Sequence, residues 1–288
     1  MQHTVSHSSG ALIAFIGSTP NIGTTITAVA TAVRIAERSQ KQIGYLCLNL
    51  KSSKLHRYIG VDQPIATLDQ LQADLRAFSL SKSKLQQAMY SPKQLPKLSI
   101  LFGNLSREQA EFYWPEHIEH LIRVAQQLYA VIIVDVSAYW DNAATITAMR
   151  LADTRVMITS VALSHFQEDR NKWTNEVAPL FQLSEVAFEY VTTHYPWKNG
   201  GFTMNQVQKQ LQLKTWDQMK VSESLLAKLD QGTYVHWLVS DRSGQQLMNQ
   251  GAATIMKRHQ IPVALQWKKE QPWFRKLTMY RRNGARTL

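Results

Sequence analysis

The sequence has little cysteine and no long hydrophobic run, and both absences limit its class. Cys47 is the only cysteine among 288 residues, which excludes an internal disulfide framework and is typical of a reducing cytosol. It lies in the apolar run IGYLCLNL, where we expect a buried, inert thiol. No apolar run approaches the roughly 18 residues of a membrane-spanning helix. The start, MQHTVSHSSG, also lacks the basic and apolar regions of a secretion signal. We therefore expect a cytoplasmic protein.

Positive charge is missing from the first part of the sequence and concentrated at its end. No lysine or arginine precedes Arg34, although the net charge of the chain is +11. From Lys257 to Leu288, nine basic residues stand against one acidic residue, Glu270. A basic end on an otherwise nearly neutral chain predicts an anionic partner, either a membrane surface or a nucleic acid.

Apolar runs of strand length alternate with longer amphipathic segments. The runs cover residues 11–17, 43–50, 98–103, 130–137, 154–160 and 188–193. They are apolar throughout, as expected for strands that are covered on both faces in a parallel sheet. Helical segments lie between them at 24–39, 115–128 and 163–180. This order predicts an α/β fold that is doubly wound, with a mostly parallel sheet and helices on both faces.

One domain accounts for most of the chain. No internal repeat and no Pro/Gly-rich linker divides it, so we expect a flexible N-terminus over residues 1–10, a domain over 11–265 and a basic tail over 266–288. In doubly wound sheets, ligands bind beyond the carboxyl ends of the strands. The segments of greatest interest are therefore 17–25, 49–54 and 135–141.

The segment IAFIGSTPNIGTTITAVATAVRIA, residues 13–36, has the form of a phosphate-binding loop between a strand and a helix. Such a loop needs glycines, a lysine for the β- and γ-phosphates and a Ser or Thr for Mg²⁺. Gly17, Gly23 and Thr25 suit these roles, and the amide dipoles of the helix would favour an anion. Thr24, however, stands at the position of the lysine. Taken alone, the segment is better explained as a tight turn around Gly23.

Later segments change this interpretation, because their order resembles that of a known family. GSTPNIGTTI aligns without a gap with the (S/T)GKGGVGKTT loop of the deviant-Walker ATPases of the MinD/ParA group. IGYLCLNLKSSKLHRYIG resembles the second strand and first switch of that group, and LSILFGN resembles its Leu-x-x-Leu-Pro-Gly segment. LYAVIIVDVSAYWDNAATITAMRLADTRVMITS resembles the run around its switch II aspartate, and VSESLLAKLDQGT resembles a late segment. The resemblance covers about residues 11–265 and is closest to the CpaE/TadZ-like pilus-assembly branch.

The resemblance implies a P-loop NTPase fold of the SIMIBI type with a vestigial nucleotide site. Thr25 matches the magnesium-binding Thr, and Asp135 closes VIIVD at the switch II position. An Asp at the end of a buried strand could equally cap the next helix, but we favour the ancestral metal-side position. ATP or ADP with Mg²⁺ is the implied ligand, bound weakly or no longer. The residues of the vestigial site are Gly17, Asn21, Gly23, Thr24, Thr25 and Asp135.

Several positions that the family uses for catalysis are altered. Thr24 replaces the phosphate-binding lysine, and Thr19 replaces the signature lysine that crosses the family's dimer. Cys47 and Asn49 replace the two aspartates of Asp-x-Asp. Phosphoryl transfer depends on positioning and on neutralising the charge of the phosphates. We therefore predict little or no ATP hydrolysis and no catalytic residue.

The positions that would contact the base and the phosphates of a nucleotide also differ from those of the family. Thr193 or His194 stands where the family usually has an asparagine near the adenine. Lys51 or Lys54 could reach a phosphate from the second loop, although a lysine in a polar loop is more often solvated. Trp140, in the switch II-like loop, is a candidate anchor of a protein interface.

A metal site is a weaker hypothesis. PEHIEH places His117 and His120 one turn apart on a predicted helix, where they could bind a transition metal. A solvated helix start with Pro115 at its first position explains the same residues. We expect no metal there.

The tail predicts an amphipathic helix that lies on anionic lipid. Apolar residues share one arc of this helix, and basic residues flank or oppose it, which is typical of interfacial helices. The tail also resembles the C-terminal membrane-targeting segment of MinD-like proteins. Docking on its own domain and binding of nucleic acid are the alternatives. The predicted membrane-binding residues are Trp273, Phe274, Arg275, Lys276, Leu277, Tyr280, Arg281 and Arg282.

The resemblance and the residues together predict a pseudo-ATPase that acts as a scaffold. It would dimerise with itself or with a related ATPase and lie at the inner face of the cell membrane. There it would position or assemble a pilus or a secretion-type machine. The alternatives are a ParA-like DNA-partitioning protein and an active ATPase with an atypical loop.

Overall fold

The computed structural model describes residues 9–51, 53–183, 188–195, 202–211 and 216–264. The tail predicted over residues 266–288, with all of its membrane-binding residues, lies outside the described residues, as do residues 1–8 of the predicted N-terminus. Among the described residues, no helix combines the length and the apolar character that crossing a membrane requires.

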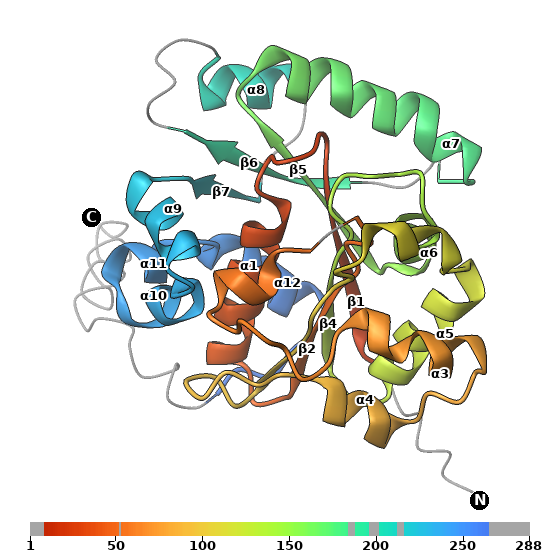
Figure 1. Cartoon of the computed structure of the whole chain (residues 1–288). Coiled ribbons are helices and arrows are strands. Elements are labelled where there is room, and N and C mark those ends of the chain that lie inside the picture. Colours follow the sequence, from red (N-terminus) through yellow and green to blue (C-terminus); the bar gives the residue numbers. More distant parts are fainter. Residues whose placement is uncertain (1–8, 52, 184–187, 196–201, 212–215, 265–288) are drawn as a thin grey trace, which may run out of the picture.

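A seven-stranded sheet forms the centre of the molecule (Figure 1). Its strands pair in the order β3-β2-β4-β1-β5-β6-β7, and every pairing is parallel. The predicted doubly wound α/β fold is confirmed. The strands are β1 Ala11–Gly17, β2 Ile43–Cys47, β3 Leu98–Leu101, β4 Val131–Asp135, β5 Thr154–Ser160, β6 Phe188–His194 and β7 Asp217–Lys220.

Alternate residues of the strands enter two separate cores. Ile13 and Phe15 of β1 pack into one core, whereas Leu12, Ala14 and Ile16 pack into the other. This follows from the period of two in a strand, and it explains why the runs are apolar throughout. The prediction erred at β7, whose sequence DQMK has no apolar run. β7 is the outer strand, and only its Met219 is fully buried, so a polar sequence suffices.

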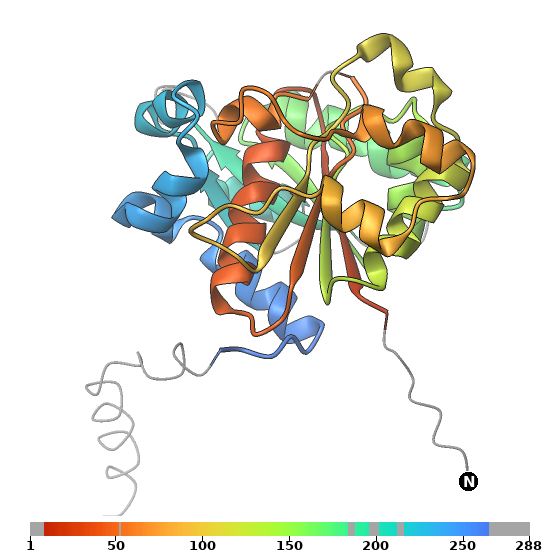
Figure 2. The same cartoon turned by 60° about the horizontal axis from the view of Figure 1, so that its bottom comes forward.

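Helices cover both faces of the sheet (Figure 2). The first core packs against α1 Thr24–Arg38, α2 Leu55–Tyr58, α9 Glu223–Asp230, α10 Tyr234–Ser240 and α12 Asn249–Arg258, with α11 Arg242–Gln246 beside α10. The second core packs against the helices η1 Leu68–Leu71, α3 Gln72–Arg76, α4 Lys82–Ala88, η2 Arg107–Phe112, α5 Pro115–Gln126, α6 Ala143–Leu151, η4 Lys172–Val177 and α7 Ala178–Leu180. Near β5 and β6 lie η3 Ser164–Asp169 and α8 Met204–Leu211. The helix predicted over 163–180 therefore exists, largely in π-helical form.

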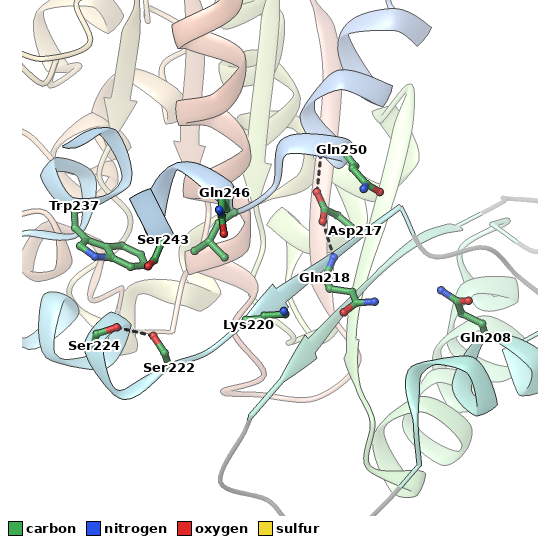
Figure 3. A pocket seen from close by; sticks show the side chains of 11 residues that line it. Gln208, Asp217, Gln218, Lys220, Ser222, Ser224, Trp237, Ser243, Gln246 and Gln250 are labelled. Carbon is green, nitrogen blue, oxygen red and sulfur yellow. Dashed lines mark hydrogen bonds between the residues drawn. The ribbon is translucent and has the colours of Figure 1, made fainter. Parts of the chain in front are cut away.

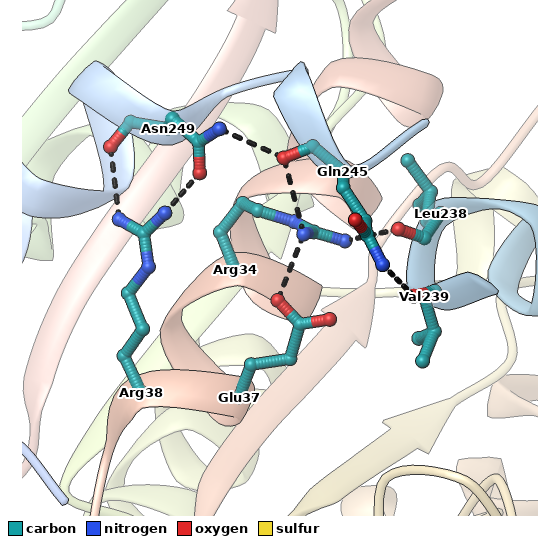
Figure 4. Close-up of polar contacts among 7 residues, drawn as sticks. All are labelled: Arg34, Glu37, Arg38, Leu238, Val239, Gln245 and Asn249. Carbon is teal, nitrogen blue, oxygen red and sulfur yellow. Dashed lines mark hydrogen bonds and ion pairs between the residues drawn. The ribbon is translucent and has the colours of Figure 1, made fainter. Parts of the chain in front are cut away.

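The second half of α1 is tied to the C-terminal helices by buried arginine contacts (Figure 4). The guanidinium of Arg34, 2% exposed, donates to the carbonyl oxygens of Leu238 at 2.5 Å and Gln245 at 3.3 Å. It also pairs with the Glu37 carboxylate at 2.8 Å. One turn later, Arg38 donates to the backbone oxygen and the side chain of Asn249. These contacts fix α1 against α10–α12.

Candidate functional site

The loop after β1 needs both of its glycines. A Cβ at Gly17 would lie 2.5 Å from Thr24 Oγ1 and 2.9 Å from Ile22 Cγ2, so a larger residue does not fit without a shift. Gly23 precedes α1 with φ of 98°, and Asn21 has φ of 61°, both in the left-handed region. The loop thus turns tightly back over the end of β1. Thr24, which is buried, turns its hydroxyl toward Gly17.

Thr25 and Asp135, which the sequence analysis placed together, are in contact. Thr25 Oγ1 donates to Asp135 Oδ2 at 2.6 Å, and the hydroxyl of Tyr45 donates to the same oxygen at 3.2 Å. The backbone N–H of Ser137 donates to Asp135 Oδ1 at 2.9 Å. Asp135 is fully buried. Burial raises the pKa of the Asp135 carboxyl, and the three hydrogen bonds oppose that rise.

Asp135 does not cap the helix that follows it. That helix, α6, is capped by Asn142, whose side-chain oxygen accepts from Thr145 N–H at 3.0 Å. Of the two roles left open for Asp135, the geometry therefore favours the position beside Thr25. Tyr45 is the partner that sequence reasoning missed. It lies two residues before Cys47 on β2, so the two side chains point to the same face of the sheet.

The two positions of the Asp-x-Asp motif carry no carboxylate and no thiolate. Cys47 is fully buried, as predicted, with its Sγ 3.2 Å from Ser53 Oγ. Burial, reinforced by Asp135, raises the pKa of the Cys47 thiol to about 12, so it remains protonated and unreactive. Asn49 accepts from the N–H of Lys51 at 3.0 Å and thereby shapes the loop.

A cavity of about 270 Å³ opens at the start of α1. Asn21, Gly23, Thr24 and Thr25 from the predicted site line it, whereas Gly17 and Asp135 lie outside its wall. Asn49, Lys54, Tyr58 and Ser137 supply further polar groups. The remaining lining residues are mainly apolar and come from α1, from the positions directly after β6 and β7, and from α9: Ile26, Tyr195, Val221, Leu226 and Leu229.

The two lysines of the second loop, Lys51 and Lys54, lie in different surroundings. Lys54 lines the cavity and is its only positively charged side chain among the described residues. Lys51 points elsewhere, because its Nζ lies 2.5 Å from Asp141 Oδ2 and 4.8 Å from the ring centre of Tyr139. The cation of this cavity therefore comes from the N-terminus of α2 and not from the loop after β1.

The positions expected near a base do not enter the cavity. Thr193 is buried, and its hydroxyl donates to the carbonyl oxygen of Thr159 at 3.0 Å. His194 is also absent from the cavity wall. Tyr195 and Tyr58 line it instead, and burial raises the pKa of both phenols, which remain neutral. Sequence reasoning missed these two tyrosines.

Thr19 and Trp140 line a second cavity of about 410 Å³ on the outer side of the loop. Trp140 is 40% exposed. One lysine, Lys172 of η4, and two carboxylates, those of Asp141 and Asp169, also line this cavity, so this face carries charges of both signs. The loop and the switch II-like segment thus share one surface, as expected for a candidate interface.

His117 has a structural partner at the start of α5. Its Nδ1 accepts the N–H of Trp114 at 3.2 Å, and its ring stacks on Trp114 with ring centres 5.7 Å apart. Within the described ranges, no group of three or more His, Cys, Asp or Glu residues is placed to hold a metal ion. Pro115 is the first residue of α5, as the helix-start interpretation expects, but His117 is buried at this helix start and not solvated.

Comparison with known proteins shows which solved structures share this fold. No protein-family model and no curated protein matches the chain. Among solved structures, it is similar to a ParA family ATPase from Chlorobium tepidum, with TM-score 0.71 and 16% identity over 85% of this chain and 99% of that one. It is similar to the cell division ATPase MinD of Pyrococcus furiosus, with TM-score 0.70 and 16% identity over 86% and 99%.

The chain has the fold of the MinD/ParA-type P-loop ATPases. A third structure makes the same point: the septum site-determining protein MinD of Pyrococcus horikoshii, complexed with Mg-ADP, has TM-score 0.66 and 17% identity over 86% of this chain and 97% of that one. Identities this low establish the MinD/ParA fold alone.

The residues present fit an anion better than a metal ion. A phosphate group at the start of α1 would meet backbone N–H groups of the helix and the Lys54 ammonium. A magnesium ion would need Thr25 and Asp135, but both oxygens of the Asp135 carboxylate already accept hydrogen bonds, and Thr25 donates one of them. The cavity thus suits a phosphate group, whereas a metal ion at Asp135 would have to compete with the hydrogen bonds from Thr25, Tyr45 and Ser137.

Proposed function

We propose that the chain is a degenerate ATPase of the MinD/ParA fold that acts as a scaffold. It would be of the CpaE/TadZ type, associate with a membrane and position or assemble a pilus or a secretion-type machine. The observation that carries this proposal is the cavity at α1, which keeps the loop and a single lysine, Lys54, but lacks every other charged group of a phosphoryl-transfer site.

Loss of hydrolysis follows from the charges that are missing. The loop between Gly17 and Thr25 has no positive side chain. The carboxylate of Asp135 accepts hydrogen bonds from Thr25, Tyr45 and Ser137. Cys47 is a protonated thiol, so no carboxylate remains there to orient water. One lysine neutralises a small part of the charge of a nucleoside triphosphate, which supports binding without turnover.

Two further features support a positioning role. Trp140 and Thr19 share an exposed surface on which a second copy or a related ATPase could dock. The basic residues between Lys257 and Leu288 would add attraction to anionic lipid, and two copies in a dimer would strengthen it. The MinD structures similar to this chain belong to proteins named for cell division and septum-site determination.

Turnover and membrane binding test this proposal separately. Purified protein should hydrolyse ATP no faster than background, and magnesium-dependent turnover that Asp135→Ala abolishes would contradict the loss of catalysis. Full-length protein should sediment with anionic vesicles, and reversing the charges of Arg281 and Arg282 to Glu should reduce the bound fraction. Equal sedimentation of both proteins would refute membrane binding by the tail.

A ParA-like role on DNA is the second candidate, because the same basic residues could neutralise phosphates of nucleic acid. DNA binding that falls steeply with salt, without binding to vesicles, would favour it. The fold is also similar to that of a ParA family ATPase.

A further inference from the structure

A second binding groove lies against the outer edge of the sheet. β7 pairs with β6 on one side and has no other partner strand in the described part of the sheet. An outer strand leaves a row of backbone N–H and C=O groups unpaired. Next to β7 is a cavity of about 690 Å³, compared with about 270 Å³ for the cavity at α1.

The cavity follows the edge of β7 and extends to both sides of the strand. Figure 3 shows side chains of α10–α12 on one side of the strand and Gln208 of α8 on the other. Gln218 and Lys220 of β7 line the cavity, while Met219 between them is buried in the core beside α1. The groove is therefore open to a chain that runs alongside the strand.

The lining is polar and uncharged over most of its length. Side-chain amides and hydroxyls both donate and accept hydrogen bonds, as peptide groups do. The side-chain amides of Gln218, Gln246 and Gln250 form no hydrogen bond with any described residue. The glutamines of the lining are Gln208, Gln218, Gln246 and Gln250, and its serines are Ser222, Ser224 and Ser243.

One positive charge in the groove has no partner among the described residues. The Asp217 carboxylate stays negative but is held at the N-terminus of α12, where it accepts from the N–H groups of Gln250 and Gly251 at 2.9 Å and of Gln218 at 2.8 Å, and where the positive end of the helix dipole offsets part of its charge. Lys220 is exposed and forms no ion pair or hydrogen bond with any described residue. It lies two residues before Ser222, the N-cap of α9. The charge that complements this end of the groove is a carboxylate.

We propose that the groove binds an extended acidic segment of a partner protein, which adds as a strand to the edge of β7 and places a carboxylate at Lys220. Strand addition takes its affinity from backbone hydrogen bonds and its specificity from pockets for alternate side chains. A second copy of this chain fits less well, because the four-residue β7 is recessed between α8 and α10–α12.

A display library of random heptapeptides, selected for binding to the full chain, tests whether the groove prefers an acidic segment. We expect enriched peptides to carry Asp or Glu. Lys220→Glu and Lys220→Met should each lower the affinity for a synthesised peptide by about tenfold, measured by fluorescence anisotropy. Lys228→Glu is the matched control, because Lys228 is on α9 outside the groove and bonds to Gln231. It should change affinity by less than about twofold. Circular dichroism checks that each variant is folded.

N-methylation of the selected peptide tests strand addition. Methyl groups on every second amide should abolish binding in one register and be tolerated in the other, because only alternate amides face β7. The proposal is overturned if no peptide is enriched, if Lys220→Glu leaves affinity unchanged, or if the two N-methylated registers bind alike.

Discussion

The hydroxyl of Thr25 and the carboxylate of Asp135 are joined by a hydrogen bond of 2.6 Å, which ties the start of α1 to the end of β4. The bond is charge-assisted when Asp135 is ionised, and it is partly buried, with Asp135 fully buried and Thr25 half-buried. Thr25→Val should therefore lower the free energy of unfolding by about 1–3 kcal/mol. Thr25→Ser keeps the hydroxyl and should lose much less. Urea unfolding measures both, and equal losses would show that the hydroxyl contributes nothing.

Burial of Asp135 makes stability depend on pH. Since its pKa is raised in the folded state, folding binds a proton that the unfolded chain has already released. The stabilising contribution of this group is complete below the ordinary pKa of an aspartate, about 3.9, and is lost as pH rises through the raised pKa. Relative to Asp135→Asn, the wild type should therefore lose stability as pH increases over this window. Urea unfolding of both proteins from about pH 3 to about pH 7 measures the difference, and a constant difference would contradict the raised pKa.

Lys54 and Lys51 form a matched pair for the cavity. Lys54→Met should weaken binding of a fluorescent ADP analogue by about tenfold, because it removes the only cation in the lining. Lys51→Met should change affinity by less than about twofold, since Lys51 is engaged by Asp141. Equal effects of the two substitutions would place the phosphates elsewhere. Absence of any binding by the wild type would mean that the nucleotide has been lost altogether.

Arg34 is expected to matter more for stability than any exposed arginine. Arg34→Met would leave the Glu37 carboxylate and the carbonyl oxygen of Leu238 without the partner that Arg34 supplies, whereas the carbonyl oxygen of Gln245 would still accept from the side chain of Asn249. The loss should be about 3–5 kcal/mol in the free energy of unfolding. The double variant Arg34→Met/Glu37→Gln should recover part of it, because the unpaired charge is removed as well. No recovery would show that packing, and not charge, sets the cost.

The fold could be predicted wherever strands are buried on both faces, because continuous apolar runs mark such strands. Strand β1 was predicted with its observed bounds, whereas β2 ended sooner, at Cys47. β7 was not predicted from the sequence, because an outer strand needs few apolar residues. Parallel topology then brought the carboxyl ends of the strands to one edge, as the general rule for such sheets requires.

The site was predicted in part, and the missed residues share a cause. Gly23 and Thr25 are local to one loop, and Asp135 closes an apolar run, so each has a sequence signal. Tyr45 and Tyr195 have none, since they meet the site only when β2 and β6 take their places in the sheet. The assignment of Lys54, and not Lys51, to the cavity likewise depends on the path of one short loop.

Helix α1 sets a fixed separation between two parts of the molecule. Its first residues line the cavity, and at its last residue the carbonyl oxygen of Arg38 accepts the N–H of Ala264, where the described chain ends. A helix of 15 residues is about 22 Å long. An anion held at one end of α1 and Ala264 at the other are thus kept about one helix length apart by a single rigid element.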